Sequence, residues 1–384
     1  MMRGIVRIRF LLPYVAGCAL IFAGCTSPLP RGGGGPSGQT RTSIESLLPA
    51  TVSDRAGWTA DMRASFAALR IAPTREHVCA AIAVIEQESG FRVDPVVPDL
   101  GRRARQEIDE RAASANVPGV LVHAALDLRS SNGRTYGERI GAARTEKQLS
   151  DTYEDFIGQV PLGRRLFSGW NPIRTRGPMQ VSVAFAERFE RIAPYPFAAR
   201  GSIPDELFTR RGSLYFGIAH LLDYQAPYDR YLFRFADYNA GQYASRNAAF
   251  QRAAALASGQ PVTADGALLA PAEGLLASGG TLLARDRPAK DAGQTERVLD
   301  RLAPRLHLTP AEIHSALEQS TTREFERTEL YRRVFALAER RGGRRLPRAV
   351  VPQIRLHGPK IERALSTDWY AHRVDGRFER CMHE

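Results

Sequence analysis

Lysine is scarce in this sequence: only Lys147, Lys290 and Lys360 stand among 53 basic residues, and all the others are arginine. Windows that alternate polar and apolar residues are few, so the sequence predicts little β-strand. It has no glycine-rich phosphate loop after a strand and no Gly-x-Ser-x-Gly nucleophile motif. Its eight histidines include no pair three or four residues apart, so we expect no metal site and no cofactor.

The overall composition is that of an ordinary folded protein. The chain has 384 residues, of which 43% are hydrophobic and 24% are charged. These values exclude an intrinsically disordered chain and a collagen-like fibre. At about 150 residues for each domain, the length leaves room for two or three structural units.

The N-terminus is typical of an export signal. Three arginines within the first nine residues precede an apolar run from Phe10 to Gly24. That run is too short to cross a bilayer comfortably, and Pro13 interrupts it. We therefore expect residues 1–24 to be a signal peptide that is removed on secretion.

A cysteine at the end of this run predicts a lipid anchor. Ala23 and Gly24 before Cys25 resemble the lipobox of bacterial lipoproteins, in which the cysteine is lipidated and becomes the first residue. Cys18, preceded by Val-Ala-Gly, fits that pattern better but leaves a very short apolar region. Cys25 is preferred as the lipidated residue, and an ordinary secreted protein is the alternative.

The residues after Cys25 point to the outer membrane. Residues 25–43 are rich in Pro, Gly and Ser, which predicts a flexible tether behind the lipidated cysteine. Thr26 gives no inner-membrane retention signal of the kind that an Asp in this place provides. We therefore expect an outer-membrane lipoprotein that faces the periplasm, with exposure at the cell surface left open.

Charge and cysteine content agree with that location. The formal net charge is +12, and it stays strongly positive without the three leader arginines. Such a surface favours anionic cell-wall polymer, lipopolysaccharide or lipid head groups, whereas export makes nucleic acid an unexpected partner. In an oxidising compartment Cys79 and Cys381 form either one long-range disulfide or two isolated thiols.

The body of the chain is predicted to be mainly α-helical. Thr74 is a suitable N-cap for a helix over 75–89, whose centre at 78–85 is apolar on all sides and therefore belongs inside a domain. Thr309, Pro310 and Glu312 form a capping box that starts another helix. Further helices are expected at 61–69, 102–115, 145–159, 181–191, 204–224, 232–256, 322–340 and 366–384.

Three short motifs follow one another along the chain. The first is Glu-Gln-Glu-Ser-Gly-Phe at 86–91, where the buried helix ends. The second is Gly-Pro-Met-Gln-Val at 177–181, and the third is Asp-Tyr-Asn-Ala-Gly at 237–241. Each of them alone is a weak signal, because such short runs occur by chance.

Together, and in this order, the motifs resemble those of the soluble lytic transglycosylases of the lysozyme superfamily. Residues 211–222 resemble the helix between the second and third motifs of that family. Pro178 replaces the usual Leu, and Asp237 stands where Ala is common. The chain is also similar to an uncharacterised bacterial lipoprotein family whose lysozyme-like domain carries an insert.

The resemblance implies a lysozyme-like domain over 44–258 with a helical insert at about 92–176. Residues 259–384 would form an additional C-terminal helical region. The length of the insert is the largest departure from the transglycosylase pattern, which has a much shorter segment there.

The chemistry points to Glu88 as the catalytic acid. Cleaving a glycosidic bond requires a carboxylic acid that stays protonated near neutral pH, and burial at the end of an apolar helix favours the neutral form. Glu86 points to another side of the helix, so only one of the two carboxylates can face a given cleft. The motif match selects Glu88, which leaves Glu86 as a partner for an arginine.

The remaining site residues come from the resemblance alone. It implies that Met179 and Gln180 line a glycan cleft beside Ser89. Tyr238 would form a hydrogen bond near the acid, and Asn239 would contact the sugar or hold its helix. Core packing is the alternative reading of Tyr238 and Asn239.

We expect this protein to cleave peptidoglycan between N-acetylmuramic acid and N-acetylglucosamine, leaving a 1,6-anhydro end. One alternative is a non-catalytic lysozyme-like scaffold that binds glycan or an envelope protein. Another is a glycoside hydrolase of the lysozyme or chitinase type. A hydrolase would need a second carboxylate, either Asp94 or an acid from the insert.

Overall fold

The computed structural model describes residues 43–114, 116–159, 171–269, 293–356 and 365–383. The predicted signal peptide, Cys18, Cys25 and the tether lie outside these residues. The described chain is mainly α-helical, as expected, and its strands form two short antiparallel hairpins. In the hairpins β1 (Thr175–Arg176) pairs with β2 (Val181–Ser182), and β3 (Arg355–Leu356) pairs with β4 (Leu365–Ser366). No helix in the described part of the chain is long and apolar enough to span a membrane.

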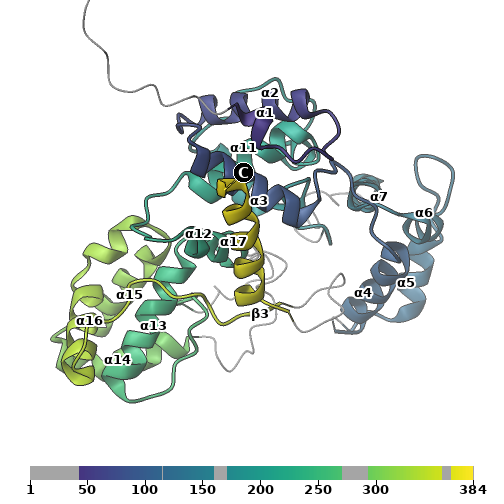
Figure 1. Cartoon of the computed structure of the whole chain (residues 1–384). Coiled ribbons are helices and arrows are strands. Elements are labelled where there is room, and N and C mark those ends of the chain that lie inside the picture. The colour runs from purple at the N-terminus through teal and green to yellow at the C-terminus, as the bar shows by residue number, and fades with distance from the viewer. Residues whose placement is uncertain (1–42, 115, 160–170, 270–292, 357–364, 384) are drawn as a thin grey trace, which may run out of the picture. The chain divides into compact units, whose positions relative to one another are not determined.

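The helices, which are labelled in Figure 1, contribute buried side chains to three clusters. The first cluster draws on α1 (Ile44–Leu47), α2 (Arg55–Ala68), α3 (Arg75–Glu88), α9 (Val183–Glu190), α11 (Arg210–Leu222), α12 (Tyr231–Ala240) and α17 (Thr367–His383), with α10 (Ile203–Glu206) at its edge. The second draws on α13 (Ala244–Ser258), α14 (Gln294–Leu306), α15 (Pro310–Glu318), η5 (Arg323–Arg327) and α16 (Glu329–Gly342), with the short turn η4 (Gln319–Thr321) between them. The third lies mainly in α4 (Leu100–Ser114), α5 (Gly119–Leu126), α6 (Tyr136–Ala142) and α7 (Glu146–Gln159).

Helix α3 lies at the centre of the first cluster. The Thr74 side chain accepts a hydrogen bond from the His77 amide at 3.2 Å, which caps the helix as predicted. Every residue from Val78 to Ile85 is buried, because α3 packs against α11 and α17 on different sides. At roughly 1.5–3 kcal/mol for each fully buried large aliphatic side chain, this burial stabilises the helix far more than its intrinsic propensity does.

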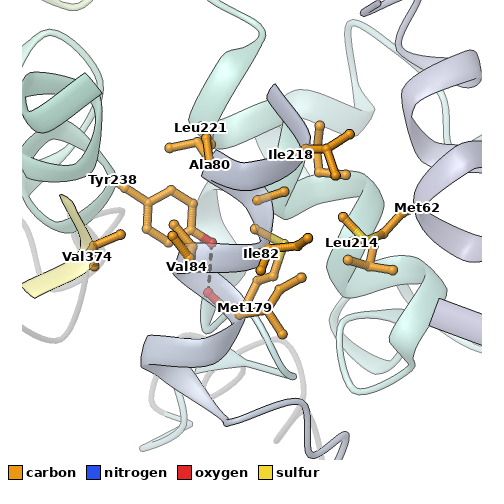
Figure 2. Packing of buried hydrophobic residues seen from close by; sticks show 14 of the residues in the cluster. Met62, Ala80, Ile82, Val84, Met179, Leu214, Ile218, Leu221, Tyr238 and Val374 are labelled. Carbon is orange, nitrogen blue, oxygen red and sulfur yellow. Dashed lines mark hydrogen bonds between the residues drawn. The ribbon is translucent and has the colours of Figure 1, made fainter. Parts of the chain in front are cut away.

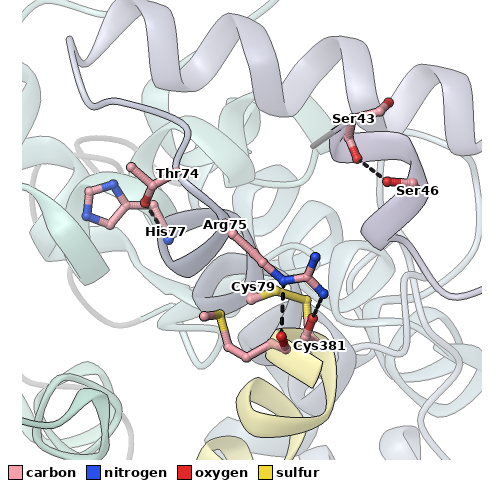
Figure 3. Close-up of a disulfide and its surroundings, with 8 residues drawn as sticks. Ser43, Ser46, Thr74, Arg75, His77, Cys79 and Cys381 are labelled. Carbon is pink, nitrogen blue, oxygen red and sulfur yellow. Dashed lines mark hydrogen bonds between the residues drawn. A yellow bond between two sulfur atoms is a disulfide. The ribbon is translucent and has the colours of Figure 1, made fainter. Parts of the chain in front are cut away.

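The C-terminal helix α17 runs antiparallel to α3 and packs against both α3 and α12. Cys79 near the start of α3 forms a disulfide with Cys381 near the end of α17, which confirms the predicted pair (Figure 3). Arg75 donates hydrogen bonds to the carbonyl oxygens of Cys381 and Met382 at 2.8 and 3.1 Å. Its positive charge therefore caps the negative end of the α17 dipole.

The hydrophobic clusters divide the chain differently from a boundary at residue 258. Helix α17 lies within the predicted C-terminal region, yet its buried side chains belong to the α3 cluster. Conversely, the buried side chains of α13 pack mainly with those of α14 to α16. The end of the chain thus returns to the part of the fold that contains the first two motifs.

The helix predicted over 232–256 is two helices, α12 and α13. They meet at Gly241, whose φ of 108° is a value that glycine adopts without strain and other residues do not. The fully buried carboxylate of Asp237 holds the bend together by accepting four hydrogen bonds. The donors are the hydroxyls of Tyr224 (3.0 Å) and Tyr228 (2.7 Å) and the amides of Tyr243 (2.9 Å) and Ser245 (2.6 Å).

Three other helices begin later than their apolar patterns predict. Ser182, Thr209 and Thr328 each accept a hydrogen bond from the backbone two or three residues into the helix, and so act as N-caps. Residues 181–191 therefore start with strand β2, and 204–224 divides into α10 and α11. The segment predicted as a helix from 322 starts with the 3₁₀ turn η5 before α16.

Candidate functional site

Glu88 is the last residue of α3, and its half-buried carboxylate faces α17. The Tyr370 hydroxyl donates a hydrogen bond of 2.6 Å to Glu88 Oε1. Burial and the nearby Glu88 charge raise the pKa of Tyr370 well above its ordinary value. Its phenol therefore stays protonated at neutral pH and remains a donor to the carboxylate.

Tyr238 brings the third motif to the same end of α3. Its hydroxyl donates a hydrogen bond of 2.7 Å to the carbonyl oxygen of Met179, in the second motif, beside Val84 of α3 (Figure 2). Burial, and then the charge of Glu88, raise the pKa of Tyr238 well above the ordinary value. The Glu88 carboxylate thus acts electrostatically on two buried phenols, and the three sequence motifs converge in the fold.

Gln180 connects this region to the insert. Its φ of 50° lies in the left-handed region, which is uncommon for a residue other than glycine. The side-chain amide donates to Glu146 Oε2 at 2.9 Å and to the Gly177 carbonyl at 3.2 Å, and its oxygen accepts from the Thr175 hydroxyl at 2.9 Å. Glu146 begins α7 and is almost fully buried, so the insert supplies a carboxylate to the second motif.

Three predicted site residues lie inside the protein. The side chain of Met179 is completely buried and packs against Gly217 of α11. The Ser89 hydroxyl donates back to the Ile85 carbonyl at 3.2 Å, which closes the last turn of α3. The Asn239 side-chain oxygen accepts from the Thr367 hydroxyl at 2.8 Å and so ties α12 to the start of α17. In this conformation these three residues support the site from the interior of the protein.

Glu86 has the structural role expected of it. Its carboxylate forms ion pairs with Arg377 and Arg380 of α17, at 3.4 and 3.5 Å. Both pairs support the packing of α17 on α3. Glu86 and Glu88 thus bind different residues of the same helix, an arginine pair in one case and a tyrosine in the other.

A metal ion has no evident ligand set in the described residues, where no group of three His, Cys, Asp or Glu side chains comes together. His220 lies close to the candidate site, stacked on Phe185 with ring centroids 4.4 Å apart and 4.8 Å from the Tyr238 ring. Burial lowers the pKa of His220 to about 3, so its ring is neutral at physiological pH.

A family model described as "Protein of unknown function (DUF1615)" matches residues 51–384. The chain belongs to this family. The match runs through the insert and continues to α17, so both are part of the DUF1615 sequence itself. The chain is also 44% identical over 365 residues to the "Uncharacterized protein YaiW" of Escherichia coli (strain K12), covering 94% of this chain and 95% of that protein. No solved structure matches the chain.

Tyr370 is the site residue of this DUF1615 chain that sequence reasoning missed. It lies 282 residues after Glu88 and outside all three motifs. The one available signal was Cys381, because a disulfide between Cys79 and Cys381 brings the last helix onto α3. Glu146 was missed in the same way, as one unspecified acid of the insert.

Proposed function

We propose that this DUF1615 protein has a lysozyme-like domain and acts as a lytic transglycosylase on peptidoglycan. The observation that carries the proposal is the convergence of the three motifs at the end of α3. Glu88 accepts from Tyr370, while Tyr238 of the third motif donates to the backbone of the second at Met179. A scaffold without chemistry has no need for a half-buried carboxylate among protonated phenols.

The proposed reaction uses Glu88 first as an acid and then as a base. The protonated carboxyl delivers its proton to the glycosidic oxygen as the bond to C1 of N-acetylmuramic acid breaks, assisted by the N-acetyl group of that sugar. The carboxylate then takes the proton from the sugar's own 6-hydroxyl, whose oxygen closes on C1. The products are a 1,6-anhydro end and a free 4-hydroxyl, with no water consumed and Glu88 reprotonated.

The neighbouring side chains orient the acid. A hydroxyl that donates to a carboxylate stabilises its charged form, so Tyr370 supports Glu88 in the basic half of the reaction. Tyr238 anchors the segment that carries Gln180. Within the second motif (177–181) Gln180 alone is partly exposed. In this proposal Gln180 contacts the glycan, whereas Tyr238, Met179, Ser89 and Asn239 hold the walls in position.

Anchoring at the outer membrane is part of the proposal. A lipid on Cys25, followed by the tether to residue 43, would keep the enzyme within reach of the cell wall from the periplasmic face. The disulfide between Cys79 and Cys381 supports this setting, because such bonds persist in oxidising compartments.

A non-catalytic scaffold is the second candidate, and one observation favours it. Tyr238 and Asn239 are nearly fully buried, and their hydrogen bonds with Met179 and Thr367 lie within the protein. In that case the same region would bind glycan, or an envelope protein, without cleaving a bond. A hydrolase is the third candidate, with either exposed Asp94 or buried Glu146 as its second carboxylate.

The deciding experiment is the digestion of purified sacculi by the full-length protein in detergent, with mass spectrometry of the products. Glu88→Gln removes the acid, and we expect it to abolish product release. Glu86→Gln is the matched control, since it removes a neighbouring carboxylate that is paired with Arg377 and Arg380. Tyr370→Phe should slow the reaction without weakening sacculus binding.

The products separate the three candidates. Anhydro-muropeptides from the wild type and from Glu86→Gln, but not from Glu88→Gln, support a lytic transglycosylase. Reducing ends would replace it with a hydrolase. Sacculus binding without any product, in the wild type as in both variants, would leave the scaffold.

A further inference from the structure

A pocket of about 440 Å³ opens directly beyond the first motif. Its lining comes from the loop before α2, from Trp58 in α2, from Phe91 to Val96 and from Arg210 at the start of α11. We call it the Trp58 pocket. Its volume lies within the range of roughly 300–1,000 Å³ that is usual for small-molecule sites.

The turn after α3 directs the chain into this pocket. Gly90 and Phe91 have φ values of 57° and 62°, so two consecutive residues adopt the left-handed conformation. Phe91 is not a glycine and carries strain there, and an edge-to-face contact with Trp58, at 5.1 Å between centroids, holds it. The pocket wall therefore starts three residues after Glu88, within roughly 11 Å of it along the chain.

The floor of the pocket offers neither an exposed aromatic face nor an uncompensated charge. Trp58 is 2% exposed and Phe91 is 7% exposed, so neither offers an open ring face on which a sugar could stack. Arg210 donates to Asp54 and to Asp61, at 2.6 Å in both cases, so its charge is compensated within the protein. These features do not suit a neutral sugar or a phosphate group.

The rim has a different character. Arg92 and Asp94 are both exposed, and within the described residues neither takes part in an ion pair. Arg92 uses only its Nε, which donates to the Ser89 carbonyl at 3.1 Å, so its terminal nitrogens remain available. Val93 and Val96 on the same rim are 36% and 52% exposed, so the rim also offers apolar surface.

One cation, one anion and two aliphatic side chains around a pocket complement a short zwitterionic peptide. Arg92 would bind its carboxylate, Asp94 its ammonium group, and the valines its small side chains. We propose that the Trp58 pocket binds the peptide stem carried by the glycan strand. Such stems have free carboxylates, an amino group on their diamino acid and the methyl groups of alanine. This assignment rests on the proposed function, whereas peptide binding itself does not.

The first test is calorimetric titration of the full-length protein in detergent with the tripeptide L-Ala-γ-D-Glu-meso-diaminopimelic acid. The variant is Arg92→Gln with Asp94→Asn, which removes both rim charges and leaves the buried floor unchanged. We expect its affinity for the tripeptide to fall about tenfold. The matched control is Arg344→Gln with Asp109→Asn, two exposed charges outside the pocket lining, which should bind as the wild type does.

Two results would overturn the proposal: no binding at millimolar tripeptide, or equal binding by the wild type and the rim variant. A linear all-L peptide, Ala-Glu-Lys, tests the source of the ligand. Weaker binding of that peptide supports the stem, and tighter binding assigns the pocket to ordinary peptides instead.

A second test separates this inference from the proposed function. Sacculi and glycan strands stripped of stems by an amidase are digested side by side. We expect the wild type to prefer stem-bearing strands at least threefold. The single variant Arg92→Gln, which leaves Asp94 in place, should lose that preference while it still cleaves stripped strands. Equal cleavage of both substrates by the wild type would contradict the pocket assignment and leave the proposed enzyme activity intact. Tripeptide binding that depends on the rim, without any cleavage, would contradict the enzyme activity and leave peptide binding by the pocket intact.

Discussion

Helices α3 and α4 are nearly the same length and are stabilised in opposite ways. All residues of α3 from 78 to 85 are buried, whereas Leu100 and Gly101 alone are buried in α4. Charge pairs accompany α4 instead, such as Arg111 with Glu107 at 2.5 Å one turn earlier. Tertiary burial on all sides therefore holds α3, whereas α4 packs against α5 and α6 and leaves most of its residues partly or fully exposed.

This difference is relevant to the proposed catalytic site. A catalytic carboxylate must be held in one geometry, and of these two helices α3 is the one that is packed against α11 and α17. The insert that contains α4 has its own smaller cluster and reaches the candidate site through the Glu146–Gln180 hydrogen bond. In the proposed reaction the insert would therefore approach the substrate, and α3 would hold the acid.

The largest expected effect comes from removing the disulfide by Cys79→Ala with Cys381→Ala. The two cysteines are 302 residues apart, so the bond constrains a very long loop of the unfolded chain. We expect the free energy of unfolding to fall by about 4 kcal/mol, measured by urea denaturation. Reduction of the wild type should produce the same shift. Hydrogen exchange should rise in α3 and α17 but not in α4, and an equal rise in both would remove the contrast between them.

A pair of isoleucine substitutions compares the two regions directly. Ile85→Ala opens a cavity at a completely buried position in α3, and we expect a loss of about 3 kcal/mol in unfolding free energy. Ile108→Ala removes a half-buried side chain of α4, and we expect about 1 kcal/mol or less. Urea midpoints of both variants measure the difference. Similar losses would show that α4 is packed more tightly than its exposure indicates.

Part of the pH dependence of stability should come from buried His220 of α11. The pKa of buried His220 is lowered from 6.5 to about 3, so the folded protein keeps the ring neutral while the unfolded chain binds a proton below pH 6.5. Stability is therefore full above pH 6.5 and declines towards pH 3, by about 2 kcal/mol from this residue at pH 5. Denaturation of His220→Gln between pH 8 and pH 5 should show a shallower decline than the wild type. The difference in unfolding free energy between the variant and the wild type at pH 8 gives the cost of the altered packing. Equal declines of both proteins between pH 8 and pH 5 would contradict the role of His220.

The smallest effect concerns the contact between the two regions. Glu146→Ala, Gln180→Ala and the double variant form a thermodynamic cycle around their 2.9 Å hydrogen bond. We expect a coupling of about 1 kcal/mol in unfolding free energy, because one partner is a carboxylate. A coupling near zero would mean that the insert and the second motif are stabilised independently.

The elements that could be predicted from the sequence are those with local or covalent signals. Thr74 and the apolar run behind it predicted α3, and the even pair of cysteines predicted the disulfide. The break at Gly241 was missed, because the apolar pattern continues across it and the buried Asp237 that holds it looks like any acid in sequence.

The part of the site that could not be predicted consists of contacts between residues that are far apart in the sequence. The motifs selected Glu88 as a candidate, and the helix geometry left Glu86 to pair with an arginine, as it does. No local pattern connects Glu88 with Tyr370 or Gln180 with Glu146. Such contacts depend on how helices pack, and packing is encoded by the whole set of buried side chains rather than by spacing along the chain.

The order of synthesis gives the α3–α17 pairing a further meaning. A chain emerges from its N-terminus, so the apolar face of α3 exists long before the helix that covers it. Until the last seventeen or so residues arrive, Glu88 has no Tyr370 and Cys79 has no partner. A chain that lacks α17 therefore exposes a free thiol at Cys79 and an uncovered apolar face on α3. The packing of α17 on α3 thus completes the surroundings of Glu88 and the disulfide in one step.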